Sequence, residues 1–275
     1  ANNLITTGRA SVVDTAVSSD DLVVGGRDTI SGGGGDDLII GGSGGTDADA
    51  LGDTLTGNGG SDIIVGDNAQ VDRTIADVIE RVTSIQPSNG GLDNIAGNGG
   101  NDTIVGGLGD DQLSGNAGSD TIFGDSATIV RPQVGSADSD DAFSIDPSIG
   151  GNDQITGGLG DDFLVGGAKD DNISGNQGVD TIIGDNGYLK RADDDLVERI
   201  YSIDPADGGE DQLNGNEGSD NIIGGVGDDS IEGGSDESDD LLIGDNGVVV
   251  RTDPDADDDN DAFSTNPTEG GVDTI

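Results

Sequence analysis

Residues 97–123 decide the fold, because they hold three consecutive copies of one nine-residue pattern: GNGGNDTIV at 97–105, GGLGDDQLS at 106–114 and GNAGSDTIF at 115–123. Three more copies read GGLGDDFLV, GGAKDDNIS and GNQGVDTII, at 157–165, 166–174 and 175–183. The shared template is G-G/N-x-G-x-D-x-U-x, where U is a large aliphatic residue. A short fixed period of this kind indicates a repeat architecture, in which each unit is stable only when it stacks on its neighbours.

Each unit combines a turn with a short strand. Two closely spaced glycines permit a tight turn, and x-U-x is too short for a helix but rich in β-branched residues. We expect two units to form one rung, with rungs stacked about 4.8 Å apart. The sequence thus predicts an all-β fold, a right-handed parallel β-roll (β-solenoid) with two short-stranded sheets and a thin aliphatic core. The expected core includes Ile30, Ile39, Leu55, Ile64, Ile95, Ile104, Leu113 and Ile122.

A longer period lies above the nonapeptide. Gly-Asp-Asn/Ser begins at residues 66, 124, 184 and 244, and a long insertion without the nonapeptide pattern follows each time. The steps between these motifs are 58, 60 and 60 residues. We therefore expect one continuous solenoid, part of a longer array. Its predicted super-repeats are 1–65, with a short insertion, 66–123, 124–183 and 184–243, and 244–275 starts the next.

Composition excludes several classes of function. The chain has 57 acidic and 10 basic residues, a net charge of −47, and no His, Cys, Met or Trp. Without Cys and His there is no disulfide, thiol nucleophile, imidazole base or usual zinc site. The negative charge disfavours nucleic acid and anionic lipid as partners, and we find no apolar stretch long enough for a membrane span. Paired carboxylates could serve glycosidase chemistry, but here they repeat identically, so no enzymatic activity is expected.

Aspartate occupies the sixth template position in every unit. These residues are Asp28, Asp37, Asp53, Asp62, Asp93, Asp102, Asp111, Asp120, Asp153, Asp162, Asp171, Asp180, Asp211, Asp220, Asp229, Asp240 and Asp273. Stacking would place Asp93 beside Asp111 and Asp102 beside Asp120, at about the strand spacing of 5 Å. Carboxylates that close repel each other unless a cation lies between them, and hard oxygen ligands favour Ca²⁺ over Mg²⁺. A solvated, turn-rich surface is the alternative, which so many in-register aspartates disfavour.

On these residues the chain resembles the RTX (repeats-in-toxin) family, whose nonapeptide G-G-x-G-x-D-x-U-x is a calcium-binding β-helix repeat. The resemblance implies several bound Ca²⁺ ions, export from a bacterial cell by type I secretion, folding outside the cell, and an extracellular or cell-surface location. It also implies that the seventeen aspartates are ligands, together with turn carbonyls. The implied carbonyls belong to Gly32, Gly57, Gly97, Gly106, Gly115, Gly157, Gly166, Gly175, Gly215 and Gly224.

Three places depart from the family pattern. Lys169 replaces the fourth-position glycine in the unit of Asp171, and residues 41–52 and 233–239 lengthen two turns. We expect the metal sites at these turns to be compromised.

Alternate units differ at the seventh and ninth positions, whose side chains point away from the core. In the first unit of each rung these side chains are almost all polar, as in Thr29 and Ser31. In the second unit the ninth residue is always apolar: Ile40, Val65, Val105, Phe123, Val165, Ile183, Ile223 and Ile243. A soluble monomer rarely exposes such a column. We expect the insertions to cover it, with thinner cover at the Asp-rich stretches 136–141 and 253–261, and a second copy of the chain is the alternative cover.

These observations favour a calcium-binding structural segment of a large secreted or cell-surface bacterial protein, such as an adhesin stalk, a surface layer or an extracellular filament. The alternative is the secretion and folding module of an RTX exoenzyme or toxin. An ice-binding solenoid is less favoured, because the polar face mixes Asn, Gln, Ser and Glu. Self-association through the apolar sheet or the insertions stays open.

Overall fold

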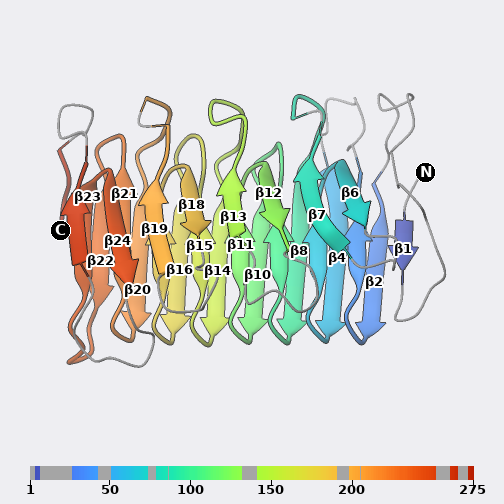
Figure 1. The fold of residues 1–275 in the computed structure, drawn as a ribbon, viewed down its shortest axis with the longest axis horizontal. Helices are drawn as coiled ribbons and strands as arrows, with labels where there is room; N and C mark the ends of the chain where they lie inside the picture. Colours follow the sequence, from blue (N-terminus) through green and yellow to red (C-terminus); the bar gives the residue numbers. More distant parts are fainter. Residues whose placement is uncertain are drawn as a thin grey trace.

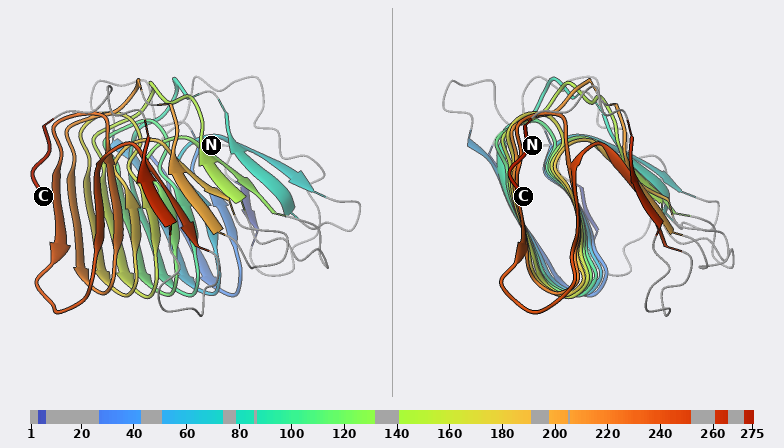
Figure 2. Two further views of the ribbon diagram at one scale, coloured as in Figure 1. Left: turned by 60° about the vertical axis from the view of Figure 1, so that its left-hand side comes forward. Right: turned by 90° about the vertical axis from the view of Figure 1, so that its left-hand side faces the viewer.

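A computed structural model describes residues 4–6, 27–42, 51–73, 79–85, 87–131, 141–190, 198–204, 206–251, 261–265 and 272–275. Their strands form three sheets in three layers, which we call the outer, central and insertion sheets (Figures 1 and 2). None of the described segments forms a helix with the length and hydrophobicity of a membrane span.

The outer sheet contains the first unit of each rung, and its eight strands are all parallel. In spatial order they are β2 (Thr29–Gly34), β4 (Leu51–Gly59), β8 (Leu92–Gly99), β10 (Gln112–Ala117), β14 (Gln154–Leu159), β16 (Asn172–Gln177), β20 (Gln212–Glu217) and β22 (Ser230–Gly234). These strands are longer than the predicted three residues, because the first residues of the next turn continue the pairing, as in Asn116 with Gly158.

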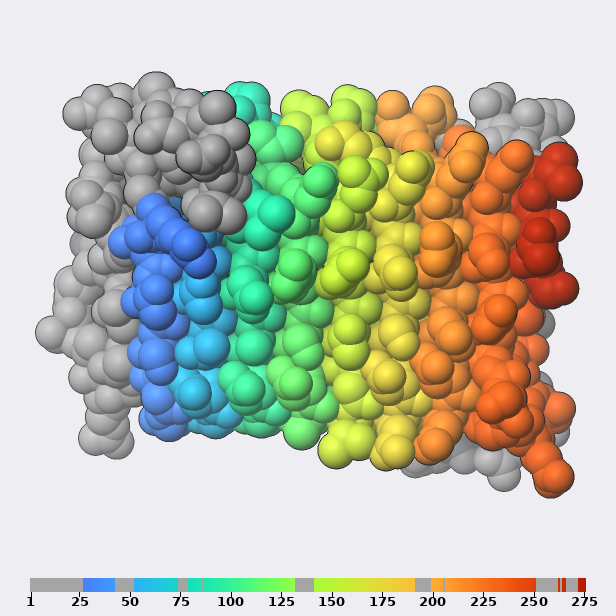
Figure 3. Space-filling view, turned by 180° about the vertical axis from the view of Figure 1, so that it is seen from behind, coloured from blue at the N-terminus to red at the C-terminus, as the bar shows by residue number. Residues whose placement is uncertain are grey.

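The central sheet contains the second unit of each rung. Its strands are β1 (Leu4–Thr6), β3 (Leu38–Ile40), β5 (Ile63–Val65), β9 (Thr103–Val105), β11 (Thr121–Phe123), β15 (Phe163–Val165), β17 (Thr181–Ile183), β21 (Asn221–Gly225) and β23 (Leu241–Asp245). All neighbours are parallel except β1, which pairs antiparallel with β3. The predicted all-β parallel solenoid with two sheets is confirmed. Seen from the side away from the insertion sheet, the rungs form ridges in sequence order (Figure 3).

The insertions supply a third sheet, which the repeat pattern did not predict. Each insertion is a hairpin, and the four hairpins join into one antiparallel sheet of eight strands. The strands are β6 (Ala69–Arg73) and β7 (Ile79–Ser84), β12 (Ala127–Val130) and β13 (Asp141–Ser144), β18 (Gly187–Lys190) and β19 (Glu198–Ser202), and β24 (Gly247–Arg251) and β25 (Asp261–Ser264).

The hairpins match the solenoid in width. One super-repeat adds two strands to the central sheet, for example β15 and β17 after β11, while its insertion adds two strands to the insertion sheet. Strand spacing is about 4.8 Å in both sheets. The two sheets therefore stay in step along the solenoid axis, and each hairpin lies beside the rungs from which it emerges.

Two apolar cores fill the spaces between the three layers. The first lies between the outer and central sheets and contains every predicted core residue, from Ile30 to Ile122. In the second, the apolar column of the central sheet packs against insertion residues such as Val71, Ile129 and Leu189. The prediction that the insertions cover this column is confirmed. The predicted thinner cover at 136–141 and 253–261 lies almost wholly outside the described residues.

Candidate metal centres

The position-six aspartates form two columns along the two edges of the solenoid, because each aspartate closes a turn between the outer and central sheets. One column lies at the edge from which the insertions leave, which we call the insertion edge, and the other lies at the opposite edge. The insertion-edge column is Asp28, Asp53, Asp93, Asp111, Asp153, Asp171, Asp211, Asp229 and Asp273. The opposite-edge column is Asp37, Asp62, Asp102, Asp120, Asp162, Asp180, Asp220 and Asp240.

A ladder of hydrogen bonds joins the aspartates of each column. The main-chain N–H of one aspartate donates to Oδ1 of the aspartate on the next rung, as from Asp93 to Asp111 and from Asp102 to Asp120, both at 2.7 Å. Fifteen such bonds run through the two columns, at 2.5–3.2 Å. The predicted stacking of these aspartates is confirmed, and the ladder fixes the orientation of the fifteen carboxylates that accept its bonds.

The second carboxylate oxygen of most ladder aspartates is buried without a hydrogen-bond partner. Among the described residues this holds for Oδ2 of Asp53, Asp62, Asp93, Asp102, Asp111, Asp120, Asp153, Asp162, Asp171, Asp180, Asp211, Asp220 and Asp229. Buried polar atoms almost always have a partner, and a buried charge is costly without one. An unpartnered oxygen repeated thirteen times therefore marks a site suited to a positive group.

Burial shifts the ionisation of these carboxylates. It raises the pKa of Asp162 to about 8. For Asp211, burial and then the charge of Asp185 raise the pKa to about 9. At Asp111 burial is again the main cause, and the charges of Asp153 and Asp93 raise its pKa further. Without a cation, these carboxylates cannot all stay ionised at neutral pH.

Turn glycines open a space beside each unpartnered oxygen. A Cβ on Gly106 would collide with Oδ2 of Asp111 and with the carbonyl oxygen of Gly124 on the next rung. At the opposite edge, a Cβ on Gly57 would collide with Oδ2 of Asp62 and lie 2.9 Å from the carbonyl oxygen of Gly97. One carboxylate oxygen and one carbonyl oxygen thus face the same place, where glycine has only hydrogen.

Most of the predicted carbonyls occupy such positions beside a glycine of the neighbouring rung. They are those of Gly57, Gly97, Gly106, Gly157, Gly166, Gly175, Gly215 and Gly224. Gly32 and Gly115 line the same kind of space beside Asp37 and Asp120. The prediction missed five equivalent carbonyls, those of Gly66, Gly124, Gly184, Gly233 and Gly244. Four of these begin the Gly-Asp-Asn/Ser motifs, which could have identified them.

The departures from the template disturb the columns less than expected. Lys169 adopts a positive φ of 74°, as a glycine would there, and Asp171 keeps its place, with its N–H 2.8 Å from Oδ1 of Asp211. Lys169 therefore leaves this aspartate in its place in the column. Asp53, after the first lengthened turn, is also in register. Asp240, after the second, accepts a hydrogen bond from the N–H of Asp220 at 3.0 Å but is only half-buried.

Half-burial also sets the two ends of the insertion-edge column apart. Asp28 and Asp273, its first and last members, remain in the hydrogen-bonded ladder. Their carboxylates are less enclosed than those in the middle of the column.

In three of the four Gly-Asp-Asn/Ser motifs the aspartate is buried too, namely Asp67, Asp125 and Asp185, although the repeat analysis gave these residues no role. Asp125 accepts hydrogen bonds from the N–H of Gly151, at 3.0 Å, and of Ala168, at 2.6 Å. Asp185 accepts from the equivalent N–H groups of Gly209 and Val226. Each carboxylate thus joins the end of an insertion to the following rung. The recurrence of the motif signalled these residues, but their partners are distant in sequence.

The donor set fits a hard divalent cation. Carboxylate and carbonyl oxygens are the ligands that Ca²⁺ prefers. Among the described residues, no group of three acidic side chains is arranged to hold a metal. A cation in these columns would therefore depend on main-chain oxygens as well as carboxylates, and the glycine spacing provides for this.

Comparison with known proteins agrees with this geometry. The family model described as RTX calcium-binding nonapeptide repeat (4 copies) matches residues 20–45, 47–69, 88–126, 150–168, 156–188 and 205–238. These ranges cover more than half of the chain. No curated protein and no solved structure matches the chain at a significant level. The chain belongs to the family of RTX calcium-binding nonapeptide repeats.

Proposed function

We propose that the chain is a calcium-assembled structural segment of a large secreted or cell-surface bacterial protein, such as an adhesin stalk, a surface layer or an extracellular filament. One observation carries the proposal: two columns of buried aspartates repeat the same unpartnered oxygen from rung to rung. An active site is a unique constellation of groups, whereas this arrangement recurs along the whole described solenoid. Such repetition suits a scaffold whose length is set by the number of repeats.

The proposed ligands are the Oδ2 atoms of the ladder aspartates and the carbonyl oxygens of the turn glycines beside them. When bound, calcium supplies the positive charge that the columns lack. In the folded chain the ladder N–H groups hold Oδ1 of the aspartates that follow the first one in each column, and this leaves Oδ2 free to face the cation. The glycines keep the space beside Oδ2 open.

Calcium dependence would also determine where the chain folds. With a net charge of −47, the calcium-free chain repels itself and stays expanded. Folding and metal binding are then one process. Extracellular calcium modules bind with dissociation constants of about 10⁻⁴–10⁻³ M. Sites in that range would be empty in the cytoplasm and filled after export, in agreement with a protein that is secreted unfolded.

A calcium titration tests the proposal. Far-UV circular dichroism and size-exclusion chromatography of the chain should show an expanded, strand-poor state in chelator and a compact β state in millimolar calcium. Magnesium at the same concentration is the control, and it should not restore the compact state. A chain that keeps its full β signal in chelator at neutral pH would contradict calcium-dependent assembly.

A matched pair of variants separates the buried columns from the general acidity of the chain. Asp111→Ala removes a buried ladder carboxylate, whereas Glu210→Gln removes one exposed charge from a turn. The first should raise the calcium concentration needed for folding, and the second should leave it nearly unchanged. Equal effects would mean that overall charge, rather than the columns, controls folding.

A further inference from the structure

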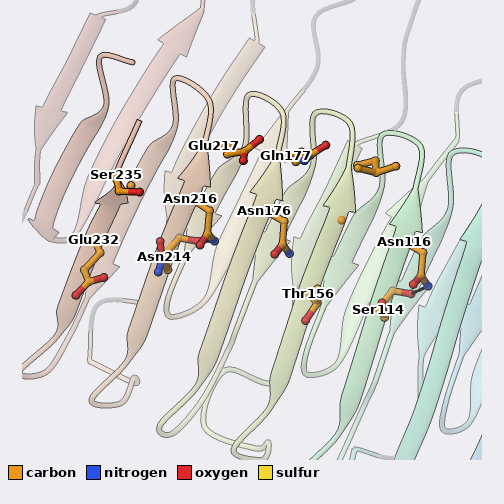
Figure 4. A pocket seen from close by; sticks show the side chains of 13 residues that line it. Ser114, Asn116, Thr156, Asn176, Gln177, Asn214, Asn216, Glu217, Glu232 and Ser235 are labelled. Atoms are coloured by element: carbon orange, nitrogen blue, oxygen red, sulfur yellow. Dashed lines mark hydrogen bonds between the residues drawn. The ribbon is translucent and has the colours of Figure 1, made fainter. Parts of the chain in front are cut away.

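The solvent face of the outer sheet carries a shallow groove of about 650 Å³ that belongs to neither metal column. It crosses β10, β14, β16, β20 and β22 and so runs along the solenoid axis (Figure 4). Asn116, Gly158, Asn176 and Asn216 form its floor, and Thr156 and Leu159 belong to its walls.

Missing side chains create the groove. Asn116, Gly158 and Asn176 occupy one register position on three neighbouring strands, and Gly158 has no side chain between the two amides. Gly234 repeats the gap beside Asn216. The residues two places before this floor and one place after it form the walls, for example Thr156 and Leu159 beside Gly158. A face that is hollowed in this way does not offer the flat, regular array that an ice surface would need.

The amides of the floor are held in place before any ligand binds. Asn116, Asn176 and Asn216 have positive φ angles of 76–79°, and Nδ2 of each donates to the carbonyl oxygen two residues earlier, at 3.2–3.3 Å. Among the described residues, no donor reaches their Oδ1 atoms. The amides therefore present oriented acceptors in a row, and a ligand that binds them loses little side-chain entropy.

The chemistry of the lining defines the ligand. Apart from Leu159 and the two glycines, the groove is lined by amides, hydroxyls and two glutamates, Glu217 and Glu232. Amides and hydroxyls both donate and accept hydrogen bonds, as do the hydroxyl groups of a sugar. The glutamates and the net charge of −47 repel anionic polymers. The groove has no buried aromatic or Arg anchor of the kind that dominates protein interfaces.

We propose that this groove binds a neutral polysaccharide, with the sugar chain lying across the strands along the solenoid axis. Four strand spacings separate β10 from β22, and each rung adds about 4.8 Å, so the groove is about 19 Å long. Several rings of an extended chain fit in that length. Leu159, 52% exposed, offers the one apolar surface for the face of a sugar ring. This proposal needs only the folded solenoid, and it stands whether or not the chain belongs to a stalk or filament.

Affinity electrophoresis in calcium-containing gels tests the proposal. The probes are hydroxyethyl cellulose, dextran, galactomannan and laminarin as neutral polysaccharides, alginate as an anionic one and chitosan as a cationic one. At least one neutral polysaccharide should retard the chain, with little dependence on salt because no charge is neutralised. Retardation by chitosan alone, abolished by salt, would show a charge effect only and overturn the proposal. So would the absence of retardation by every neutral probe.

A matched pair of variants locates the site. The double variant Asn176→Gly, Asn216→Gly keeps the positive φ but removes two amides from the floor, and it should bind about tenfold more weakly. Asn98→Gly removes the same kind of amide in the same register column, outside the groove, and should bind normally. Equal losses in both would overturn the assignment.

A second pair of variants tests the wall of the groove with substitutions of exposed residues, which should leave folding intact. Circular dichroism in calcium checks that each variant is folded. Leu159→Asp changes one exposed residue of the wall, and Val179→Asp changes an exposed residue outside the groove. The first should weaken binding several-fold and the second should not. If Leu159→Asp binds as the parent does, the groove is not the site.

Discussion

Replacing Asp211 by Asn should change the stability of the calcium-free and calcium-loaded states in opposite directions. Asp211 is 1% exposed, its Oδ1 accepts the N–H of Asp171 at 2.8 Å, and burial raises its pKa to about 9. In the calcium-free folded chain at pH 7, Asp211 must therefore carry a proton. In the unfolded chain, where an aspartate has a pKa of 3.8, it does not. Taking up that proton costs about 4 kcal/mol, at 1.36 kcal/mol for each pH unit between 3.8 and 7.

An asparagine avoids this cost, because it is neutral and keeps Oδ1 for the hydrogen bond from Asp171. Its Nδ2 would replace an oxygen that lies beside Gly184, where the carbonyl oxygen of Gly224 is 2.5 Å from the position of a Cβ and offers an acceptor. The calcium-free folded state should gain up to about 4 kcal/mol at pH 7. The calcium-loaded state should lose stability, because a charged ligand is gone.

Urea unfolding of Asp211→Asn and the parent chain measures both effects, in chelator and in saturating calcium. If the calcium-free parent is unfolded, titration with trimethylamine N-oxide drives folding and allows the comparison. Glu210→Gln, in the same turn but exposed, is the control and should change neither state by more than about 0.5 kcal/mol. An Asp211→Asn variant that is destabilised in chelator would refute the argument from buried charge.

Further predictions concern pH, packing and the two aspartate classes. In chelator, the β signal should rise as the pH falls from 8 to 5. The reason is that burial raises the pKa values of ladder carboxyls to about 6–9 in the folded chain. At a pH below these values the folded chain binds protons more tightly than the unfolded chain, which stabilises the fold. This stabilisation is lost as the pH rises through that window. Val105→Asp, at 1% exposure between the central and insertion sheets, should lower the thermal unfolding temperature sharply, whereas Gln112→Asp on the solvent face should not; equal melting curves would mean that the insertions do not pack there. Asp111→Ala and Asp171→Ala should raise the calcium midpoint of folding equally, since Lys169 does not displace Asp171; a smaller effect at Asp171 would show that Lys169 weakens its site. Asp125→Ala should increase the hydrogen exchange of the Gly151 and Ala168 N–H groups, because both lose their acceptor; unchanged exchange there would contradict the anchoring role.

The sequence predicted the solenoid well, because its determinants are local. Equal nine-residue units place Asp93 beside Asp111 whatever the rest of the chain does. The alternation of polar and apolar ninth residues likewise required a cover over the central sheet. Both conclusions follow from the nine-residue spacing, which can be read from the sequence without knowledge of distant contacts.

The insertion sheet and the anchoring aspartates could not be predicted in the same way. Asp125 bonds to N–H groups 26 and 43 residues away, and no short period connects those positions. The backbone at Lys169 has a related explanation. A lysine disfavours positive φ on its own, but the rungs on either side fix the backbone of that turn, so the surroundings overrode the local preference.

The equal width of one hairpin and two rungs has a consequence for how such a protein can change in length. A block of 58–60 residues contains two rungs and one hairpin, so its duplication or deletion leaves every remaining strand opposite its old neighbours. Loss of a single rung would instead offset the insertion sheet from the solenoid by about 4.8 Å. Unequal recombination between the gene segments that encode these blocks would therefore be tolerated only in whole blocks. We expect natural length variants of this array to differ by multiples of that block.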